Sequence, residues 1–544
     1  MLTGDMLRRS AQRFPGKAAI IRDDTRLSYA ELDAAANRLA HALIATCEAT
    51  CEATCEATCE ATCKTTGAGR GGKGGKGAKG AKVAMLSRNL PEYGIVFFGA
   101  ARSGLILVNV SVLYAADELA FVLDKSDSEI LIFDAAFADK VAAIRGRCAR
   151  LKTLVCIGEG GASVDRAIPF AQFMAGHADT EPDVPMAETD PFCMTYTGGT
   201  TGRPKGVLCS HRARTLTAHT VAIEEALDER DVVAIVTPLF HVAALNIMFQ
   251  PAILVGATCT LVTPWSADKF MDTAARDGVT AAFMVPTQAN MLVSSPNFDA
   301  AMLATWRKLT FAGAPMPDWV QLELKKRLPQ LLLTQIYGQS EMGVLTSLRD
   351  WHLAAKLGSV GRQAYNVELA LFTPEGKRVG PGELGEIGSR GDNLMLEYYD
   401  EPEQTAAFFK HGGGWGLTGD VGIMDADGFI TLVDRAKDML ISGGENVYPK
   451  EIEDVIFQLD AVSECAVFAV PDSKFGELPA AYISLKAGTV LTEAEVVEHC
   501  RTRLAEFKRP RIVKFVTDFP KTPIGKIQKN VLKEPYWKDR TKRI

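Results

Sequence analysis

Residues 196–207 read Tyr-Thr-Gly-Gly-Thr-Thr-Gly-Arg-Pro-Lys-Gly-Val, a run that combines glycines, hydroxyl groups and one lysine. The backbone amides and hydroxyls of such a loop can wrap a polyphosphate chain. The run lacks the Walker spacing. In that motif four residues separate two glycines, and the second glycine is followed directly by Lys and then by Ser or Thr. The run therefore predicts a phosphate-binding loop outside the usual nucleotide-hydrolase fold.

Short apolar segments alternate with helix-length amphipathic segments around this loop, which predicts an α/β domain with stacked, largely parallel sheets. The expected strands are residues 83–87, 105–110, 130–133, 232–237, 258–262, 280–285, 309–312 and 332–336. Ligands bind beyond the carboxyl ends of the strands in such sheets. Four of these strands are followed by informative polar segments, at 238–241, 286–287, 313–315 and 337–341. We expect these four segments to converge on one site.

The C-terminal part of the chain predicts a second, smaller domain. Turns rich in glycine and proline at residues 373–390 indicate a small β-rich subdomain, after which the first domain is expected to end near residue 434. The segment beyond has strand patterns at 465–470, 480–485 and 512–516 and a helix pattern at 493–506. The predicted domains are residues 1–434 and a mobile α+β domain of residues 435–544.

Composition favours an enzyme that acts on small molecules. The chain has 544 residues, 47% of them apolar, and its 60 basic and 66 acidic residues give a formal net charge of -6. This balance predicts no basic face that would drive nucleic-acid binding. The N-terminus lacks the apolar core of a signal peptide and the C-terminus lacks a peroxisomal signal, so we expect a cytoplasmic protein.

The most apolar stretch, residues 94–115, contains Arg102 and Asn109 near its middle. These two polar side chains favour a helix followed by a buried strand over a membrane span. No transmembrane segment is expected.

The twelve cysteines fall into two groups. Reduced core thiols of cytosolic proteins lie inside apolar runs, and seven cysteines do so here: Cys148, Cys156, Cys193, Cys209, Cys259, Cys465 and Cys500. The other five belong to a tandem repeat at residues 45–64, Ala-Thr-Cys-Glu four times and then Ala-Thr-Cys-Lys.

The repeat can extend a helix that starts after Ser28, which has capping-box spacing to Glu31. A four-residue period advances about 400° on a helix of about 3.6 residues per turn, so the cysteines drift by about 40° per repeat and coiled-coil pairing is disfavoured. Residues 65–82 have the glycine-rich, basic composition of a flexible linker, so residues 45–82 are interpreted as an insert. The cysteine spacing lacks the short pairs of zinc motifs, which leaves a soft-metal or redox role as the weaker alternative.

Four further motifs follow the glycine-rich run in order: Tyr337-Gly-Gln-Ser-Glu341, Trp415-Gly-Leu-Thr-Gly-Asp420, Asp434-Arg-Ala-Lys-Asp-Met-Leu-Ile-Ser-Gly-Gly-Glu-Asn-Val-Tyr-Pro449 and Pro523-Ile-Gly-Lys526. With them the sequence resembles the adenylate-forming acyl-CoA synthetase family, which includes acyl- and aryl-CoA ligases, luciferases and peptide-synthetase adenylation domains. The resemblance covers nearly the whole chain except residues 45–82. It implies an ATP-dependent acid:CoA ligase that forms an acyl-adenylate and pyrophosphate, and then an acyl-CoA thioester and AMP, with ATP, Mg²⁺ and coenzyme A.

The resemblance also implies roles for the matched residues. Lys526 contacts the carboxylate and the α-phosphate, Glu341 and Thr200 bind Mg²⁺, and His241 is a gate between the phosphate site and the acyl pocket. The implied nucleotide contacts are Thr197, Gly198, Gly199, Thr200, Thr201, Gly202, Lys205, Gly313, Ala314, Pro315, Tyr337, Gly338 and Ser340, with Asp420 and Arg435 at the ribose. The small domain is implied to rotate at Lys437 into a thioester-forming pose, in which Ser442, Gly443 and Gly444 face the thiol channel.

Four questions stay open at the level of the sequence: the thiol acceptor, the type of activity, the class of acid and the oligomeric state. Free coenzyme A is favoured over a separate carrier protein, and a fused carrier is not expected because only eighteen residues follow Lys526. A luciferase-like oxidation would use the same motifs, whereas a non-catalytic homologue would be expected to lack Lys526, Glu341 or Asp420, which are all present. The mostly apolar segments 241–249, 283–287 and 313–316 favour a fatty or aryl acid over an amino acid. The sequence does not decide between a monomer and a homodimer.

Overall fold

The computed structural model describes residues 1–62, 79–159, 164–197, 204–314, 316–435, 440–442, 445–472, 475–521 and 527–538. The chain divides into two compact units. Unit 1 comprises Met1–Asp350, Ala364–Val367 and Arg390–Phe409, and unit 2 comprises Trp351–Gln363, Glu368–Ser389 and Lys410–Ile544. The predicted C-terminal domain, residues 435–544, lies inside unit 2, and its boundary remains a prediction.

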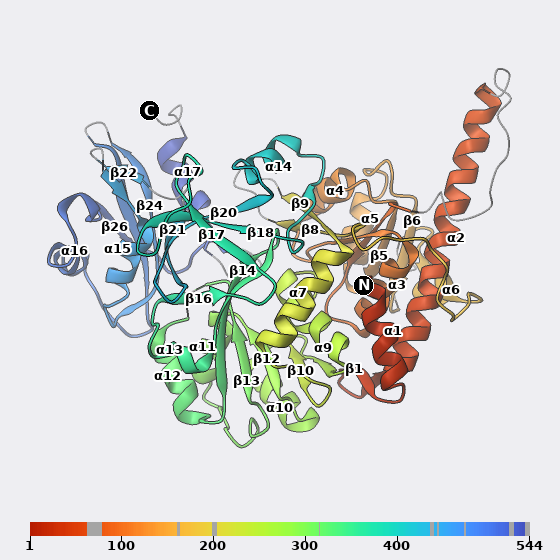
Figure 1. Ribbon diagram of the computed structural model, residues 1–544, viewed down its shortest axis with the longest axis horizontal. Coiled ribbons are helices and arrows are strands. Elements are labelled where there is room, and N and C mark those ends of the chain that lie inside the picture. The colour runs from red at the N-terminus through yellow and green to blue at the C-terminus, as the bar shows by residue number, and fades with distance from the viewer. Residues whose placement is uncertain are drawn as a thin grey trace. The chain divides into compact units, whose positions relative to one another are not determined.

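Unit 1 contains a sheet with the strand order β15-β14-β13-β12-β10-β11-β1-β2. Its strands are β1 (Ala18–Arg22), β2 (Thr25–Ser28), β10 (Val232–Ile235), β11 (Thr258–Leu261), β12 (Ala281–Met284), β13 (Lys308–Phe311), β14 (Leu332–Gln339) and β15 (Gly343–Leu348). Neighbours from β14 to β1 pair in parallel, whereas β14 with β15 and β1 with β2 pair antiparallel. Figure 1 shows β10, β12, β13 and β14 of this sheet in the green and yellow-green parts of the chain, whereas β1 belongs to the red N-terminal part.

A second sheet of unit 1 has the order β19-β9-β8-β4-β3-β5-β6-β7. Its strands are β3 (Lys82–Leu86), β4 (Ile106–Asn109), β5 (Ile130–Asp134), β6 (Thr153–Ile157), β7 (Ile168–Pro169), β8 (Pro191–Thr197), β9 (Lys205–Ser210) and β19 (Glu397–Tyr398). The run from β8 to β7 is parallel, and β9 adds antiparallel to β8. Every strand predicted between residues 83 and 336 is present, which confirms the α/β prediction with largely parallel sheets.

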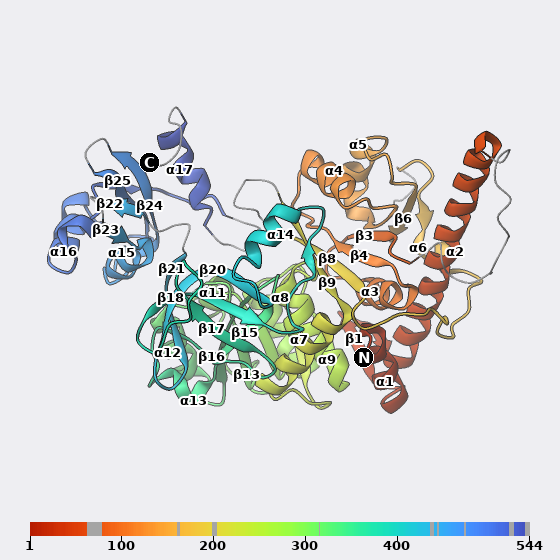
Figure 2. The same ribbon diagram turned by 45° about the horizontal axis from the view of Figure 1, so that its top comes forward.

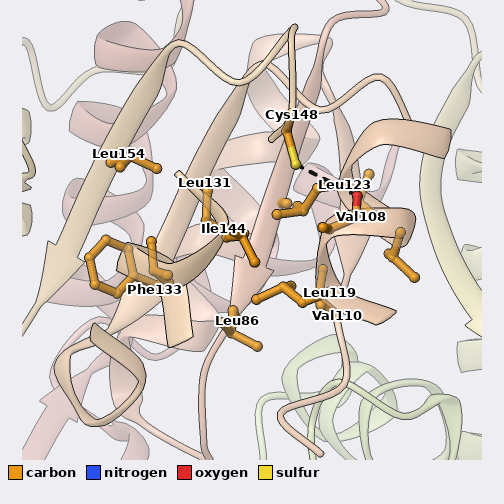
Figure 3. Packing of buried hydrophobic residues seen from close by; sticks show 14 of the residues in the cluster. Leu86, Val108, Val110, Leu119, Leu123, Leu131, Phe133, Ile144, Cys148 and Leu154 are labelled. Carbon is orange, nitrogen blue, oxygen red and sulfur yellow. Dashed lines mark hydrogen bonds between the residues drawn. The ribbon is translucent and has the colours of Figure 1, made fainter. Parts of the chain in front are cut away.

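Helices join and cover these strands. They are α1 (Thr3–Arg13), α2 (Tyr29–Thr62), α3 (Pro91–Ser103), α4 (Ala116–Lys125), α5 (Ala138–Ile144), α6 (Phe170–Met174), α7 (His211–Glu224), α8 (Val242–Ala244), α9 (Gln250–Val255), α10 (Ala267–Asp277), α11 (Pro286–Val293), α12 (Asp318–Arg327) and α14 (Pro402–Phe408). Figure 3 shows the core between the second sheet and helices α4 and α5, where Leu119 and Ile144 pack with Leu131. All five residues of β5 are buried, as expected for a central parallel strand covered on both faces.

The prediction that the cysteine repeat extends a helix is confirmed as far as Thr62, where α2 ends. The capping box at its start is formed, because the Ser28 N–H donates to Glu31 Oε2 at 2.8 Å and the Glu31 N–H donates to Ser28 Oγ at 3.3 Å. α2 packs against α3, and Cys47, at 3% exposure, is the last buried residue of α2 whose side chain is described. Figures 1 and 2 both show the C-terminal end of α2 standing away from the sheets of unit 1.

The predicted linker lies mostly outside the described residues, which resume at Lys79. Lys79 Nζ forms a salt bridge with Asp190 Oδ2 at 2.7 Å. Lys82, the last residue of the predicted linker, begins β3 and pairs with Ile106. The end of the predicted insert is therefore already part of the folded unit.

The apolar stretch at residues 94–115 forms most of α3 and then β4, as predicted. Arg102 on α3 is 1% exposed, and its guanidinium donates to Asp33 Oδ1 and to Asn37 Oδ1, both at 2.6 Å. A buried cation needs such partners because its desolvation is unfavourable. Over the ranges that the structure covers, no helix is both long and apolar enough to cross a membrane.

The seven cysteines predicted to be core thiols are all buried and free. Cys148 Sγ donates to the carbonyl oxygen of Ala120 at 3.6 Å, a contact drawn in Figure 3. Burial raises the pKa of several of these thiols, Cys500 to about 11 among them, so they stay protonated at neutral pH.

Unit 2 contains two groups of strands. The first has the order β17-β18-β20-β21-β16, with β16 (Ser359–Gln363), β17 (Glu368–Phe372), β18 (Leu384–Arg390), β20 (Trp415–Met424) and β21 (Phe429–Arg435). The second is β23-β22-β25-β24 with β26 beside β25, and comprises β22 (Leu440–Ser442), β23 (Glu445–Val447), β24 (Val462–Asp472), β25 (Gly476–Leu485) and β26 (Ile512–Phe515). Helices α15 (Pro449–Ile456), α16 (Glu493–Arg501) and α17 (Lys529–Trp537) complete the α+β domain that the sequence predicts.

The end of α2 offers a test of which part of the repeat contributes to stability. We expect replacement of residues 51–78 by a short Gly-Ser linker to leave the thermal unfolding midpoint within about 2 °C of the original. The C-terminal end of α2 stands away from the sheets of unit 1 (Figures 1 and 2), and changes at such a place cost little. A longer deletion from residue 43 removes Leu43 and Cys47, which are 0% and 3% exposed. It should lower the midpoint clearly, since each buried apolar side chain contributes about 1.5–3 kcal/mol. An equal fall in both deletions would contradict this division of α2.

Glu225, which follows α7, is a buried carboxylate at 6% exposure. Burial raises the pKa of Glu225 to about 7, although a hydrogen bond with Thr310 lowers it. Because this folded-state pKa lies above the unfolded value of about 4.3, the folded protein binds the proton more tightly. The resulting contribution to the free energy of unfolding is present below about pH 4 and is lost as the pH rises through about 7.

We therefore expect Glu225→Gln to remove part of the pH dependence of stability. Between about pH 5.5 and about pH 8 the unfolding midpoint of the variant should fall less than that of the original protein, as thermal melts would measure. Glu229→Gln alters an exposed carboxylate four residues further along the chain and serves as the control. Parallel curves for the original protein and Glu225→Gln would show that Glu225 keeps an ordinary pKa.

Candidate active site

Four neighbouring strands end at one edge of the first sheet. β14, β13, β12 and β10 are consecutive in the sheet and parallel. Their carboxyl ends therefore meet at the edge where α/β proteins bind ligands. The residues that follow these ends are His241 after β10, Pro286 after β12, Gly313 and Ala314 after β13, and Ser340 and Glu341 after β14.

Ser340 and Glu341 lie on a tight turn between β14 and β15. β14 is three residues longer than predicted, because its last residues pair antiparallel with β15 as far as Gln339 opposite Gly343. A Cβ atom on Gly338 would lie 2.0 Å from the carbonyl oxygen of Gly343, which has φ +71°. The hairpin thus requires glycine at both positions. It holds the Glu341 side chain in a buried position, at 8% exposure.

The glycine-rich loop begins and ends at one place on the second sheet. Thr197, the last residue of β8, and Lys205, the first residue of β9, are cross-strand partners. Gly206 follows in a crowded place, since a Cβ atom there would lie 2.7 Å from Met194 Sδ and would displace that side chain. The predicted phosphate contacts Gly198, Gly199, Thr200, Thr201 and Gly202 lie outside the described residues.

A tyrosine connects the Glu341 turn to the returning end of the loop. The Tyr398 hydroxyl donates to Glu341 Oε1 at 2.9 Å, and Lys205 Nζ lies 5.0 Å from the centroid of the Tyr398 ring. Burial and the neighbouring Glu341 charge raise the pKa of Tyr398, so its hydroxyl remains a donor. The structure thus brings the predicted residues Glu341 and Lys205 to one side chain that the sequence interpretation had not selected.

His241 is a neutral histidine at the start of α8. Its Nδ1 accepts a hydrogen bond from the Ala243 N–H at 3.1 Å, so the proton of the neutral ring is on Nε2. Burial lowers the pKa of His241 to about 4, which keeps the ring uncharged at neutral pH. The residues Leu245–Phe249 that follow form a π-helical turn, a feature often found at functional sites.

The predicted adenine contacts lie at the same sheet edge. Tyr337 is half-buried on β14, where it pairs with Thr346 of β15. Gly313 has φ +89°, and both Gly313 and Ala314 are exposed. Pro315, predicted together with them, lies outside the described residues.

Asp420, Arg435 and Ser442 belong to unit 2. Asp420 on β20 and Arg435 on β21 are cross-strand partners in an antiparallel pair. The Asp420 N–H donates to Thr418 Oγ1 at 3.0 Å, and Gly419 between them has φ +73°. Ser442 is 2% exposed on β22, opposite Glu445.

Four predicted residues of the C-terminal part, Lys437, Gly443, Gly444 and Lys526, lie outside the described residues. Their roles as hinge, thiol-channel lining and catalytic lysine therefore remain predictions from the sequence.

The described residues show how a magnesium ion could be held. Among these residues no three His, Cys, Asp or Glu side chains form a cluster that could hold a metal by itself. Mg²⁺ is commonly bound by one or two carboxylates together with phosphate oxygens and waters. The Glu341 carboxylate, which Tyr398 connects to Lys205 at the start of β9, fits this mode of binding, in which the ion arrives with a nucleotide.

Comparison with known proteins identifies the relatives of this chain. The AMP-binding enzyme family matches residues 75–399, and the AMP-binding enzyme C-terminal domain matches residues 451–526. Feruloyl-CoA synthase of an Amycolatopsis species is 33% identical over 97% of this chain and 98% of that protein. Long-chain-fatty-acid–CoA ligase FadD13 of Mycobacterium tuberculosis is 34% identical over 98% of each chain.

A solved structure agrees with these relatives. The anthranilate CoA ligase AuaEII in complex with anthranoyl-AMP has a TM-score of 0.83 and 27% identity over 98% of this chain and 96% of that chain. The first family match alone spans more than half of this chain, and the full-length relatives exceed 30% identity. The resemblance predicted from the ordered motifs is confirmed, and the chain belongs to the family of AMP-binding enzymes.

Proposed function

We propose that this protein is an ATP-dependent acid:CoA ligase acting on a fatty or aryl carboxylic acid. In the first step a carboxylate oxygen attacks the α-phosphorus of ATP, and pyrophosphate leaves. In the second step the coenzyme A thiol attacks the acyl carbon, loses its proton and displaces AMP. The observation that best supports the proposal is the meeting of Glu341 and Lys205 at Tyr398, which joins a carboxylate to the end of the phosphate loop.

The first step brings two anions together. Two like charges about 4 Å apart repel by about 4 kcal/mol at an effective dielectric constant of 20, so cations and oriented donors are needed. Lys205 at the loop and Lys526 on the C-terminal domain would supply positive charge. Bound Mg²⁺, held by Glu341 and Thr200, would neutralise phosphate charge.

The remaining residues of the first site would orient the nucleotide and the acid. Thr197 and the loop amides would hold the phosphates, Tyr337 would stack on adenine beside Gly313, and Asp420 with Arg435 would bind the ribose hydroxyls. His241 would separate the phosphate site from the acyl pocket. Its neutral ring suits this place, since an imidazolium there would attract the acid carboxylate away from the α-phosphate.

The second step is proposed to use a different pose of the C-terminal domain. Rotation at Lys437 would remove Lys526 from the acyl-adenylate and bring residues 442–444 to the channel that the thiol enters. This exchange separates the two half-reactions, so one active site can serve a charged nucleotide first and a bulky thiol afterwards.

Apolar side chains near His241 support a fatty or aryl acid as the substrate. Four apolar side chains near His241 are buried: Leu245 and Met248 on the turn that follows it, and Phe283 and Met284 at the end of β12. Such side chains bind an alkyl chain or an aromatic ring and offer no counter-charge for an α-amino group. The feruloyl and long-chain fatty acid relatives are consistent with this class.

Lys526→Ala is expected to separate the two half-reactions. Exchange of pyrophosphate into ATP, measured with the acid present, should fall by about a hundredfold or more because the lysine stabilises the first transition state. Thioester formation from supplied acyl-adenylate should fall by less than about tenfold. Lys521→Ala, which removes a surface salt bridge to Glu464, is the matched control. Equal losses in both half-reactions would refute the two-pose assignment.

A substrate screen tests the proposed activity itself. AMP release and thioester formation would be measured with coenzyme A and with acetate, medium- and long-chain fatty acids, benzoates, cinnamates and amino acids. We expect a member of the fatty or aryl series to give both products with equal yields, and amino acids to give neither. Adenylation of amino acids alone, or AMP release without thioester from every acid, would overturn the assignment.

A further inference from the structure

Tyr398 is fixed by its backbone as well as by its side chain. In the segment of residues 395–399, the Met395 N–H donates to the carbonyl oxygen of Glu341 at 2.6 Å. The Leu396 and Tyr399 N–H groups donate to the carbonyl oxygens of Leu208 and Gly206, both at 2.8 Å. One short segment is therefore bonded to the Glu341 turn and to β9, the strand that begins at Lys205.

The side chain of Tyr398 extends this connection into the site. Its hydroxyl contacts Glu341 Oε1 at 2.9 Å, while Lys205 Nζ lies over its ring face at 5.0 Å from the centroid. The ring also packs edge-on against Phe408 with centroids 6.1 Å apart, which limits its rotation. A hydrogen bond to a charged acceptor is among the stronger ones in proteins, and it is strongest where water is scarce, as around the buried Glu341 carboxylate.

We propose that Tyr398 is a positioning residue for the adenylation step, which holds the Glu341 carboxylate in the orientation that receives Mg²⁺ with its nucleotide. This inference rests on the proposed function. A glutamate side chain has several rotamers, and binding must select one of them. The tyrosine makes that selection before the nucleotide arrives, which lowers the cost of binding. Its ring face orients the Lys205 ammonium at the same time through a cation–π contact.

Tyr398→Phe isolates the hydroxyl, because the ring, its contact with Phe408 and the face offered to Lys205 remain. The chain offers a matched control in the next residue, since the Tyr399 hydroxyl donates to Asp127 Oδ2, also at 2.9 Å. Asp127 is not among the residues of the proposed site. Tyr399→Phe therefore removes the same kind of bond from the same segment without touching Glu341.

The experiment has one readout of binding and one of activity. Binding of Mn²⁺ in the presence of ATP, followed by electron paramagnetic resonance without any acid substrate, should weaken about five- to tenfold in Tyr398→Phe and stay unchanged in Tyr399→Phe. The Mg²⁺ concentration for half-maximal pyrophosphate exchange should rise by the same factor. Thioester formation from supplied acyl-adenylate should be unaffected, because it requires no metal-bound ATP.

A double-mutant cycle tests whether Tyr398 acts through Glu341. In a Glu341→Gln background, Tyr398→Phe should change Mn²⁺ binding no further. Wild-type Mn²⁺ binding and Mg²⁺ dependence in Tyr398→Phe, or equal losses in the two tyrosine variants, would overturn the inference. If Tyr398→Phe fails to fold while Tyr399→Phe folds, the hydroxyl is structural and the inference is also overturned. Absence of acid-dependent exchange in the original protein would instead refute the proposed function.

Discussion

The parallel pairing of β10, β12, β13 and β14 is the constraint on which the rest of the site depends. Parallel strands end at a common edge, so segments up to a hundred residues apart in the sequence are placed side by side there. The strands themselves are short and apolar, and burial on both faces fixes them. The edge that they form carries polar residues, from His241 to Glu341. We expect the chemistry of the site, more than packing, to determine which residues stand there.

The site also requires that this sheet edge lie near the ends of the phosphate loop, which connects β8 and β9 of the other sheet. The segment that contains the short strand β19 makes this connection, because it is hydrogen-bonded both to the Glu341 turn and to β9. Tyr398 adds a side-chain contact to Glu341 and an aromatic face to Lys205. A carboxylate and an ammonium group are thereby both in contact with one tyrosine side chain, the carboxylate through its hydroxyl and the ammonium group through its ring face.

Much of this could be predicted from the sequence, and the exceptions have physical causes. Central parallel strands such as β5 are short, continuous apolar runs, so their positions were correct to within a few residues. β14 was predicted too short because its last residues depend on antiparallel pairing with β15, a tertiary contact that no local pattern encodes. Tyr398 could not be selected for the same reason, since its partner Glu341 is 57 residues away. The burial of Glu225 could not be predicted either, because in the sequence this residue follows a helix in the same way as a solvent-exposed carboxylate does.

The central chemical step of the proposed function is attack of the acid carboxylate on the α-phosphorus of ATP. The most direct test uses a substrate acid with oxygen-18 in its carboxylate and mass spectrometry of the products. Attack on the α-phosphorus predicts one labelled oxygen in each AMP, because thiol attack on the acyl carbon leaves that oxygen on the phosphate. Unlabelled AMP, or ADP with the label in inorganic phosphate, would contradict the account.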